Sequence, residues 1–321
     1  MSENPIFSSV AALPPGIETA VVAKAVREQF GLQGHYSQLV SERDQNFRLL
    51  SADGSSYVVK VTSFVENPDV TDFQIAALLH LEQCGLTGVP RIVRTESGGD
   101  RGVIRNDAGD ETVLRIVTWL DGEVMKNANL TADVCFRFGH QLADLDSALA
   151  SFSHVGDRQE LLWDMQRAAE LRQLLVHIDD RDVLPLVEQV LDDFETRVSA
   201  SLKGLVCQVI HNDANDENIL LDAHQNIAGF IDFGDMLRAP RIVDVAIAAA
   251  YLRTVDGDPM RFIVPFVRGY NERNPLSETE LNLLYDLIRT RLMMTLTILY
   301  WRISARAPGV PYREKTLMGD A

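Results

Sequence analysis

The stretch VIHNDANDENILL at residues 209–221, followed by GFIDFGD at residues 229–235, decides how this chain is interpreted. It contains His-x-Asp-x-x-x-x-Asn, then a short hairpin pattern, then an apolar residue and Asp-Phe-Gly. From average residue frequencies, the first motif alone arises by chance in on the order of one in 70 chains of this length. The Asp-Phe-Gly at hairpin distance lowers that chance by a further factor of roughly a thousand. The combined motif therefore carries functional information.

The residue types in this motif are those that magnesium-dependent phosphoryl transfer requires. An attacking hydroxyl needs a carboxylate that accepts or orients its proton, and Asp213 is placed for that role. Mg²⁺ prefers oxygen ligands, commonly a carboxylate and an amide oxygen together with phosphates and water. Asn218 and Asp232 would supply that pair from opposite strands of one hairpin, and Gly234 would let the chain turn away directly afterwards. The sequence thus predicts a kinase that uses Mg²⁺ and a nucleoside triphosphate.

The first third of the chain has the pattern of a small antiparallel sheet with helices. Apolar periodicity predicts helices at residues 16–30, ending at Gly31, and 69–83, ending at Gly85. The predicted strands are residues 35–40, 46–50, 56–61, 91–96 and 112–119. The tetrapeptide Ser-Ala-Asp-Gly at residues 51–54 is a strong hairpin signal between the second and third strands.

After the Leu-Asp-Gly at residues 120–122, helical patterns dominate. Predicted helices cover residues 131–149, 161–176, 184–202 and the region from 242 onward, apart from a loop at 256–259. Short strands are predicted at residues 206–210, 219–222 and 227–232. We therefore predict an α+β fold of two lobes. Residues 1–119 would form a five-stranded nucleotide-binding lobe and residues 120–321 a mostly helical catalytic and substrate lobe, with a hinge and a nucleotide cleft between them.

Composition limits the partners of the chain. A net charge of -16 disfavours nucleic acid as a partner. It favours a cationic ligand if the negative charge gathers near the site. A role of the acidic residues in solubility alone would explain the same net charge. The three cysteines form no CxxC pair, which fits a reducing compartment. The N-terminus shows no secretory signal, and the apolar runs at 245–252 and 292–301 are too short to span a bilayer. We expect a cytoplasmic protein with neither a nucleic-acid nor a membrane partner, and leave room for a homodimer.

With these motifs the chain resembles the aminoglycoside phosphotransferase and choline kinase superfamily, which is related to the protein kinases. The resemblance runs from about residue 16 to residue 301 and implies a bilobal protein-kinase-like fold. Only residues 235–243 separate the Asp-Phe-Gly from Asp244, which is too short for the activation segment of a protein kinase. A protein substrate is therefore disfavoured.

The resemblance also implies nucleotide-binding residues. Lys60, near the end of a strand, would hold the α- and β-phosphates of ATP or GTP. The loop at residues 41–46, ending at Asn46, would cover the phosphates, although it lacks glycines and an ordinary β-turn explains it nearly as well. The hinge at residues 116–122 would bind the purine through backbone groups around Thr118 and Leu120, while Trp119 would pack as a hydrophobic residue.

Supporting roles follow from the same resemblance. His211 would orient the catalytic loop, Asp244 would steady that loop through its backbone amides, and Asp235 would either support the metal or face a substrate amine. Gln74 stands where the family has a glutamate that pairs with the strand lysine. Because glutamine accepts a hydrogen bond but cannot form an ion pair, Lys60 would be held less firmly, unless Glu66, Asp72 or Glu82 substitutes.

The acceptor is the least determined part of the prediction. With His-x-Asp-x-Asn-Asp-x-Asn at residues 211–218 and Ile-Asp-Phe-Gly-Asp-Met at residues 231–236, the chain resembles the hydroxylysine kinase branch. This resemblance implies transfer to the hydroxyl of 5-hydroxylysine, a small cationic substrate. Acidic residues could line its site, although solvated helix faces explain most of them: Asp144, Asp146, Asp164 and Glu170. An antibiotic-modifying aminoglycoside phosphotransferase, a homoserine- or choline-type kinase and a nucleotide-binding pseudokinase stay open. The intact Asp213, Asn218 and Asp232 argue against the pseudokinase, which Gln74 alone favours.

Overall fold

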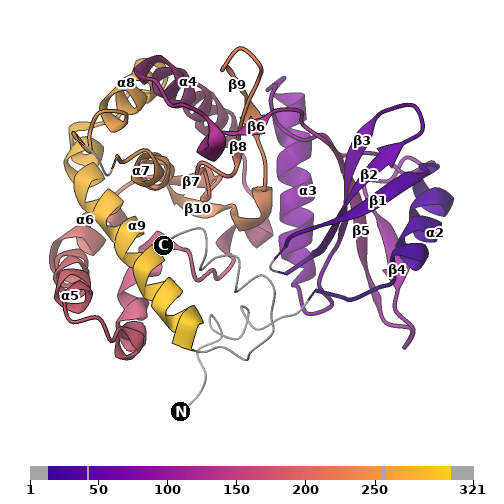
Figure 1. Ribbon diagram of the computed structural model, residues 1–321, viewed down its shortest axis with the longest axis horizontal. Coiled ribbons are helices and arrows are strands. Elements are labelled where there is room, and N and C mark those ends of the chain that lie inside the picture. The colour runs from indigo at the N-terminus through magenta and orange to yellow at the C-terminus, as the bar shows by residue number, and fades with distance from the viewer. Residues whose placement is uncertain (1–13, 42, 255–256, 305–321) are drawn as a thin grey trace. The chain divides into compact units, whose positions relative to one another are not determined.

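An antiparallel five-stranded sheet organises the first third of the chain (Figure 1). In the computed structural model, which describes residues 14–41, 43–254 and 257–304, the strand order is β1-β2-β3-β5-β4. The strands are β1 Gly34–Leu39, β2 Gln45–Ser51, β3 Ser56–Val61, β4 Gly102–Arg105 and β5 Glu111–Thr118. The predicted β2–β3 turn is confirmed, since the Gly54 N–H donates to the Ser51 carbonyl and Gly54 has a φ of 87°. Glycine adopts this left-handed conformation without steric cost.

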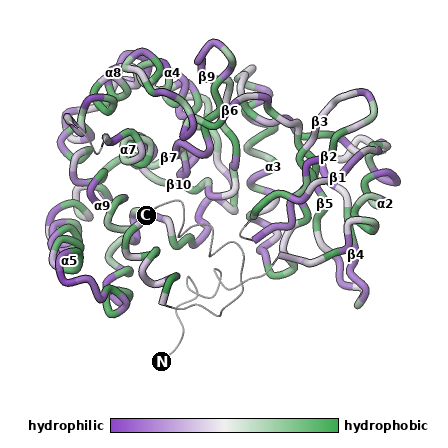
Figure 2. Tube along the Cα trace, viewed as in Figure 1, coloured by the Kyte–Doolittle hydropathy of each residue, from purple (hydrophilic) through white to green (hydrophobic). Residues whose placement is uncertain are grey.

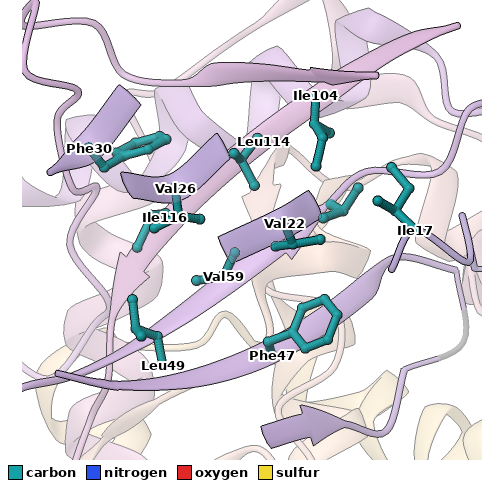
Figure 3. Packing of buried hydrophobic residues seen from close by; sticks show 11 residues of the cluster. Ile17, Val22, Val26, Phe30, Phe47, Leu49, Val59, Ile104, Leu114 and Ile116 are labelled. Atoms are coloured by element: carbon teal, nitrogen blue, oxygen red, sulfur yellow. The ribbon is translucent and has the colours of Figure 1, made fainter. Parts of the chain in front are cut away.

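Two helices, α2 Thr19–Phe30 and α3 Pro68–Gln83, lie on opposite sides of this sheet (Figure 1). As predicted, α2 ends at Gly31, which has a φ of 67° and donates its N–H to the Arg27 carbonyl. Helix α3 begins after Asn67, whose side chain accepts a hydrogen bond from the Asp69 N–H. Figure 3 shows the apolar face of α2 packed on strand residues, in a cluster that includes Val22, Val26, Phe30, Phe47, Leu49, Val59, Leu114 and Ile116.

The fourth strand differs from the prediction. Residues 91–96 do not form a strand, and within them only Ile92 makes a β-bridge, to Val117. The strand is instead β4, which pairs with the first half of β5 through a turn at residues 106–110 that the sequence analysis missed. Residues 91–93 border the other half of β5, where Arg91 and Val93 hydrogen-bond to Thr118 and Ile116. Strand β4 and residues 91–93 therefore each pair with a different half of the same edge of β5. For this reason residues 91–96 do not form the predicted strand.

The remainder of the chain is mostly helical. Its α-helices are α4 Ala132–Leu149, α5 Val183–Asp193, α6 Ser199–Lys203, α7 Ile242–Tyr251, α8 Ile263–Arg273 and α9 Glu278–Ser304. The predicted helix at 161–176 is a 3₁₀-helix, η3 Met165–His177, and a π-helical turn, Phe194–Val198, joins α5 to α6. Strands β7 Cys207–Ile210 and β10 Leu237–Pro240 pair with each other, and β6 Glu123–Val124, β8 Ile219–Leu221 and β9 Ile227–Phe230 form a further sheet. The sequence analysis did not predict β6 and β10.

Apart from Asp244 in its first turn, helix α7 is mostly apolar (Figure 2). Its residues from Ile242 to Ala250 are buried. Helices α4 and α8 approach each other closely at two glycines. A Cβ atom at Gly139 would lie 2.1 Å from the Phe266 carbonyl oxygen, and one at Gly269 would lie 2.0 Å from the Phe136 carbonyl oxygen. Only glycine permits this contact between helix backbones.

The chain divides into two compact units. The first takes the residues up to Leu120 together with His154–Gly156, and the second takes the others. The small segment joins the first unit because His154 stacks on Phe73, with ring centroids 5.9 Å apart, a contact the sequence analysis did not predict. No helix within the described ranges is long and apolar enough to cross a membrane. Residue 42 of the predicted phosphate loop and residue 256 of the predicted late loop lie outside the described residues.

Candidate active site

The loop between β7 and β8 fixes the carboxylate of Asp213 through both of its oxygens. Asn218 Nδ2 donates to Asp213 Oδ2 at 2.7 Å and to the Asp213 carbonyl at 2.9 Å. Asn215 Nδ2 donates to Asp213 Oδ1 at 2.9 Å. The side chain of Asp213 is 22% exposed, so part of this oriented carboxylate faces solvent.

The β8–β9 hairpin brings Asn218 and Asp232 to the same end of one ladder. Ile219 pairs with Phe230, and the Ile231 N–H donates to the Asn218 carbonyl at 2.9 Å. Asp232 follows directly, is exposed and has a φ of 60° with a ψ of 70°. The turn predicted at Gly234 therefore occurs at Asp232 itself, ahead of a 3₁₀ turn at Phe233–Asp235. A non-glycine residue in this region is strained, and such strain concentrates at functional sites.

The donor set at this end of the hairpin fits a magnesium ion. Asn218 directs its amide nitrogen to Asp213, so its amide oxygen is the atom that remains for a cation, and Asp232 adds a carboxylate. Within the described ranges, no group of three or more His, Cys, Asp or Glu side chains could hold a metal. One carboxylate and one amide oxygen suit Mg²⁺, which takes most of its other ligands from phosphates and water.

His211 links the catalytic loop to the strand that carries Asp232. Its Nε2 is 3.1 Å from the Ile231 carbonyl oxygen, and its Nδ1 accepts a hydrogen bond from the Asp213 N–H at 3.2 Å. Because Nδ1 is an acceptor, Nε2 carries the proton and donates it. Burial lowers the pKa of His211 to about 4, so the ring is neutral near pH 7. His211 is therefore a structural link and not a proton acceptor from substrate.

Asp244, in the first turn of α7, holds the same loop from the other side. Its carboxylate accepts hydrogen bonds from the backbone N–H groups of His211 at 2.8 Å and Asn212 at 2.6 Å. Asp146 of α4 interacts with Asp244 and accepts a hydrogen bond from the Tyr270 hydroxyl at 2.6 Å. Burial, reinforced by the charge of Asp244, raises the pKa of Asp146 well above its ordinary value. Asp146 therefore holds its proton more tightly than an exposed aspartate does, and it supports Asp244 from behind.

The electrostatic environment makes Asp213 a stronger base than an exposed aspartate. Burial raises the pKa of Asp213 to about 8, and the charges of Asp235 and Asp232 add to that effect. Arg291 of α9 acts in the opposite direction, with its Nη2 3.3 Å from Asp213 Oδ1. A carboxyl whose pKa lies close to the working pH is well suited to accept a proton from a hydroxyl.

In the first unit, Lys60 has a charged neighbourhood built from three strands and a loop. It pairs with Asn46 of β2 on one side and with Arg115 of β5 on the other. Asn46 is the second residue of β2, so it belongs to a strand and does not end the loop as the sequence analysis expected. Asp44 binds Arg115 with Nη2–Oδ2 at 2.9 Å, and its charge also acts on Lys60. Burial raises the pKa of Asp44, but Arg115 and Lys60 outweigh it and lower the value.

Gln74 is buried in α3, and a carboxylate from outside this helix acts on Lys60. Of the three candidates, Asp72 pairs with Arg101, and Glu66 accepts a hydrogen bond from the Asn67 N–H. Asp44, which the sequence analysis did not select, is a carboxylate whose charge acts on Lys60. The sequence feature that could have identified Asp44 is its position in the predicted phosphate loop, two residues before Asn46.

Two residues of the predicted hinge, Thr118 and Trp119, already form hydrogen bonds within their own unit. The Thr118 N–H donates to the Arg91 carbonyl at 2.9 Å, and the Thr118 hydroxyl accepts from the Arg91 N–H at 2.9 Å. The Trp119 N–H donates to the Ser56 carbonyl, and the guanidinium of Arg48 lies 4.3 Å from the centroid of the Trp119 ring. A purine would therefore have to use other backbone groups, such as those of Leu120. Trp119 stacks on a cation and is not only a hydrophobic residue.

Three of the four acidic residues suggested for the acceptor site make contacts within their own unit. Asp146 is fully buried against Tyr270, Asp164 caps η3 by accepting from the Gln166 N–H, and Glu170 pairs with Arg167. Sequence reasoning also missed Arg291, because nothing in the motif places a residue of α9 beside Asp213.

Comparisons with known proteins agree with this geometry. The model of the phosphotransferase enzyme family matches residues 35–281. The chain is 26% identical to hydroxylysine kinase of Mus musculus, with 93% of this chain and 86% of that protein covered. It is 27% identical to hydroxylysine kinase of Danio rerio, with 95% and 88% covered.

Among solved structures, amicoumacin kinase hAmiN in complex with AMP-PNP, Ca²⁺ and Ami superposes with a TM-score of 0.72 at 18% identity, covering 94% of this chain and 91% of that one. That likeness shows the fold alone. Together the matches confirm the predicted family resemblance, the α+β kinase-like fold class and the predicted enzyme class, phosphoryl transfer to an alcohol group.

Proposed function

Since this chain belongs to the phosphotransferase enzyme family, we propose that it transfers the γ-phosphoryl of ATP or GTP to the hydroxyl of a small hydroxy amino acid, foremost 5-hydroxylysine. The relatives named hydroxylysine kinase, which the chain matches over nearly its whole length, support this acceptor. The observation that carries the reaction type is the position of Asp213, held by Asn218 at the end of the hairpin that presents Asp232.

Asp213 would act on the acceptor hydroxyl. As the hydroxyl oxygen attacks the γ-phosphorus, the bond from that phosphorus to the β,γ-bridging oxygen breaks, and the hydroxyl proton passes to the Asp213 carboxylate. The products are a phosphate ester and a nucleoside diphosphate. Asn218 and Asn215 hold both carboxylate oxygens, which fixes the direction in which Asp213 accepts the proton.

Asn218 and Asp232 would hold Mg²⁺, which when bound neutralises charge on the transferring phosphates. Asp235, whose charge acts on Asp213, would support the metal or face a substrate amine. In the first unit, Lys60 would hold the α- and β-phosphates, with Asn46 on the neighbouring strand. In the hinge around Thr118 and Leu120, the backbone groups of Leu120 would bind the purine, because the Thr118 N–H is hydrogen-bonded to Arg91. Residues 1–119 would thus have a nucleotide-binding role and residues 120–321 a catalytic role.

A transfer assay with a panel of acceptors tests this function. The purified chain is incubated with Mg²⁺ and either ATP or GTP, with 5-hydroxylysine, homoserine, choline or kanamycin as the acceptor. We expect turnover with 5-hydroxylysine and loss of that turnover when Mg²⁺ is chelated. Turnover with kanamycin or choline alone would contradict the acceptor class, and tight nucleotide binding with no turnover would identify a pseudokinase.

A further inference from the structure

Arg291 of α9 is a buried cation beside the proposed catalytic carboxylate. Only 3% of its side chain is exposed, and its Nη2 lies 3.3 Å from Asp213 Oδ1. Its Nε and Nη1 are buried and make no hydrogen bond of ordinary geometry to the described residues, although the Tyr251 side chain is near enough to act on the guanidinium. A buried donor without a partner is costly, because the group has lost its hydrogen bonds to water. The Arg291 guanidinium is thus held beside Asp213, and its Nε and Nη1 are available to donate hydrogen bonds to a ligand.

Two other arginines in the same unit show what a purely structural guanidinium looks like. Arg238 donates from Nε, Nη1 and Nη2 to Asp157 and to two backbone carbonyls. Arg241 likewise uses all three nitrogens, to Glu280, Asn274 and a backbone carbonyl. Both are more exposed than Arg291, yet both are more completely paired. Several other arginines leave one buried nitrogen without a hydrogen-bond partner, but within the described residues only Arg291 leaves two.

Aromatic side chains fix the position of the Arg291 guanidinium. Its Cζ lies 4.6 Å from the centroid of the Trp163 ring and 5.8 Å from that of the Tyr251 ring. Burial lowers the pKa of Arg291, but Tyr251 and Asp213 outweigh it and raise the value, so the side chain is charged. A planar cation held between rings keeps its hydrogen-bonding edges in a defined direction and is suited to bind a carboxylate through two parallel hydrogen bonds.

We propose that Arg291 binds the carboxylate of the acceptor, so that the enzyme selects hydroxy amino acids over the corresponding amino alcohols. This inference rests on the proposed function and names the substrate group that the function leaves open. The acceptor hydroxyl must lie within hydrogen-bond reach of Asp213, and Arg291 is one hydrogen bond away from that carboxylate. In 5-hydroxylysine the carboxylate and the reacting hydroxyl lie at the two ends of a flexible carbon chain, which can fold to bring the carboxylate to the guanidinium while the hydroxyl stays at Asp213. A polycationic antibiotic would instead meet a buried positive charge there.

The test compares two acceptors that differ only in the carboxylate. These are 5-hydroxylysine and the diamino alcohol that results from its decarboxylation. We expect Arg291→Gln to lower kcat/KM for 5-hydroxylysine on the order of 100-fold, mainly through KM, since it removes a charge-assisted pair of hydrogen bonds. For the diamino alcohol we expect only the smaller loss that follows from removing the cation beside Asp213. Any effect of Arg291 on Asp213 is common to both acceptors, so the ratio between them isolates the contact with the carboxylate.

Two variants serve as controls. Arg291→Lys keeps the charge but loses the planar fork, and should show an intermediate, still carboxylate-selective loss. Arg289→Gln removes the same charge from the same helix, where Arg289 pairs with Asp193, and should leave the ratio between the acceptors unchanged. Equal losses on both acceptors in Arg291→Gln, or the same selective loss in Arg289→Gln, would overturn the proposal.

A binding measurement separates this inference from the proposed function. Lysine has the carboxylate but no hydroxyl, and its binding is measured by calorimetry without nucleotide, in the wild type and in Arg291→Gln. Binding that weakens on the order of 100-fold in the variant supports the role of Arg291 even if no hydroxy amino acid is phosphorylated, in which case the proposed function alone fails. Equal binding in both proteins, together with an unchanged ratio between the two acceptors, overturns the inference while the function stands.

Discussion

The catalytic segment of the second unit and the lysine site of the first unit are held in different ways. In the second unit, Asp213 is fixed by Asn215 and Asn218, which lie only two and five residues away. In the first unit, Lys60 pairs with Arg115 of a strand far along the chain, and the charge of Asp44 in a loop acts on it. Contacts between near neighbours in sequence produce a motif with fixed spacing, whereas contacts between distant strands do not. The first kind of site is therefore recognisable from sequence and the second is not.

The largest effect is expected when the proposed metal ligand of the second unit, Asp232, is replaced. Asp232→Asn keeps the size of the side chain and the left-handed backbone, which asparagine tolerates, but removes the charge. We expect phosphoryl transfer to fall on the order of 1,000-fold, because Mg²⁺ loses its carboxylate ligand. Binding of the nucleotide should also lose its dependence on Mg²⁺. Unchanged magnesium-dependent affinity, measured by calorimetry with and without the metal, would refute the ligand role.

The second prediction concerns the contribution of the buried His211 ring to the stability of the folded protein. His211 has an ordinary pKa of 6.5 and a pKa of about 4 when buried, so between these values the unfolded chain binds more protons than the folded one. The free energy of unfolding therefore falls as the pH falls through this window, by about 2 kcal/mol from this residue between about pH 7 and pH 5.

Because other groups titrate as well, His211→Gln is the reference for this measurement. Urea unfolding should show that the wild type loses more stability than the variant on acidification. Parallel losses would mean that the His211 ring does not stay neutral in the folded protein.

A smaller effect tests the first unit. Asp44→Asn removes the carboxylate that acts on Lys60 and should raise the KM for the nucleotide about tenfold, with kcat changed less. Gln74→Glu in this variant should restore part of the loss if a helix carboxylate can take over the role. Nucleotide kinetics with the acceptor saturating measure both. No change in the KM of Asp44→Asn would mean that Lys60 needs no carboxylate partner.

The same contrast explains which parts of the molecule could be predicted. Helix α2 and the β2–β3 hairpin were predictable because Gly31 and Gly54 mark their ends locally. The strand predicted at residues 91–96 was wrong because β4 occupies part of the same sheet edge, which depends on tertiary pairing. Asp44 and Arg291 were missed for the same reason. Each reaches its partner across 16 or 78 residues, distances at which no spacing rule operates.

The chemistry of the central site was predictable only as far as residue types allow. The motif placed Asp213, Asn218 and Asp232 together, but not the hydrogen bonds that orient them or the buried Asp146 behind Asp244. Asp146 was instead considered for the acceptor site, because an acidic residue on a helix gives no sign of whether it is solvated or buried. Burial is set by the packing of α4 against α8, where Tyr270 meets it.

The most direct measurement follows label from the γ-position of the nucleotide to the hydroxyl of 5-hydroxylysine, in the wild type and in Asp213→Asn. This account predicts labelled product from the wild type, a loss on the order of 1,000-fold in the variant, and nucleotide affinity within about twofold in both. A variant that labels the acceptor at a rate near that of the wild type would contradict it.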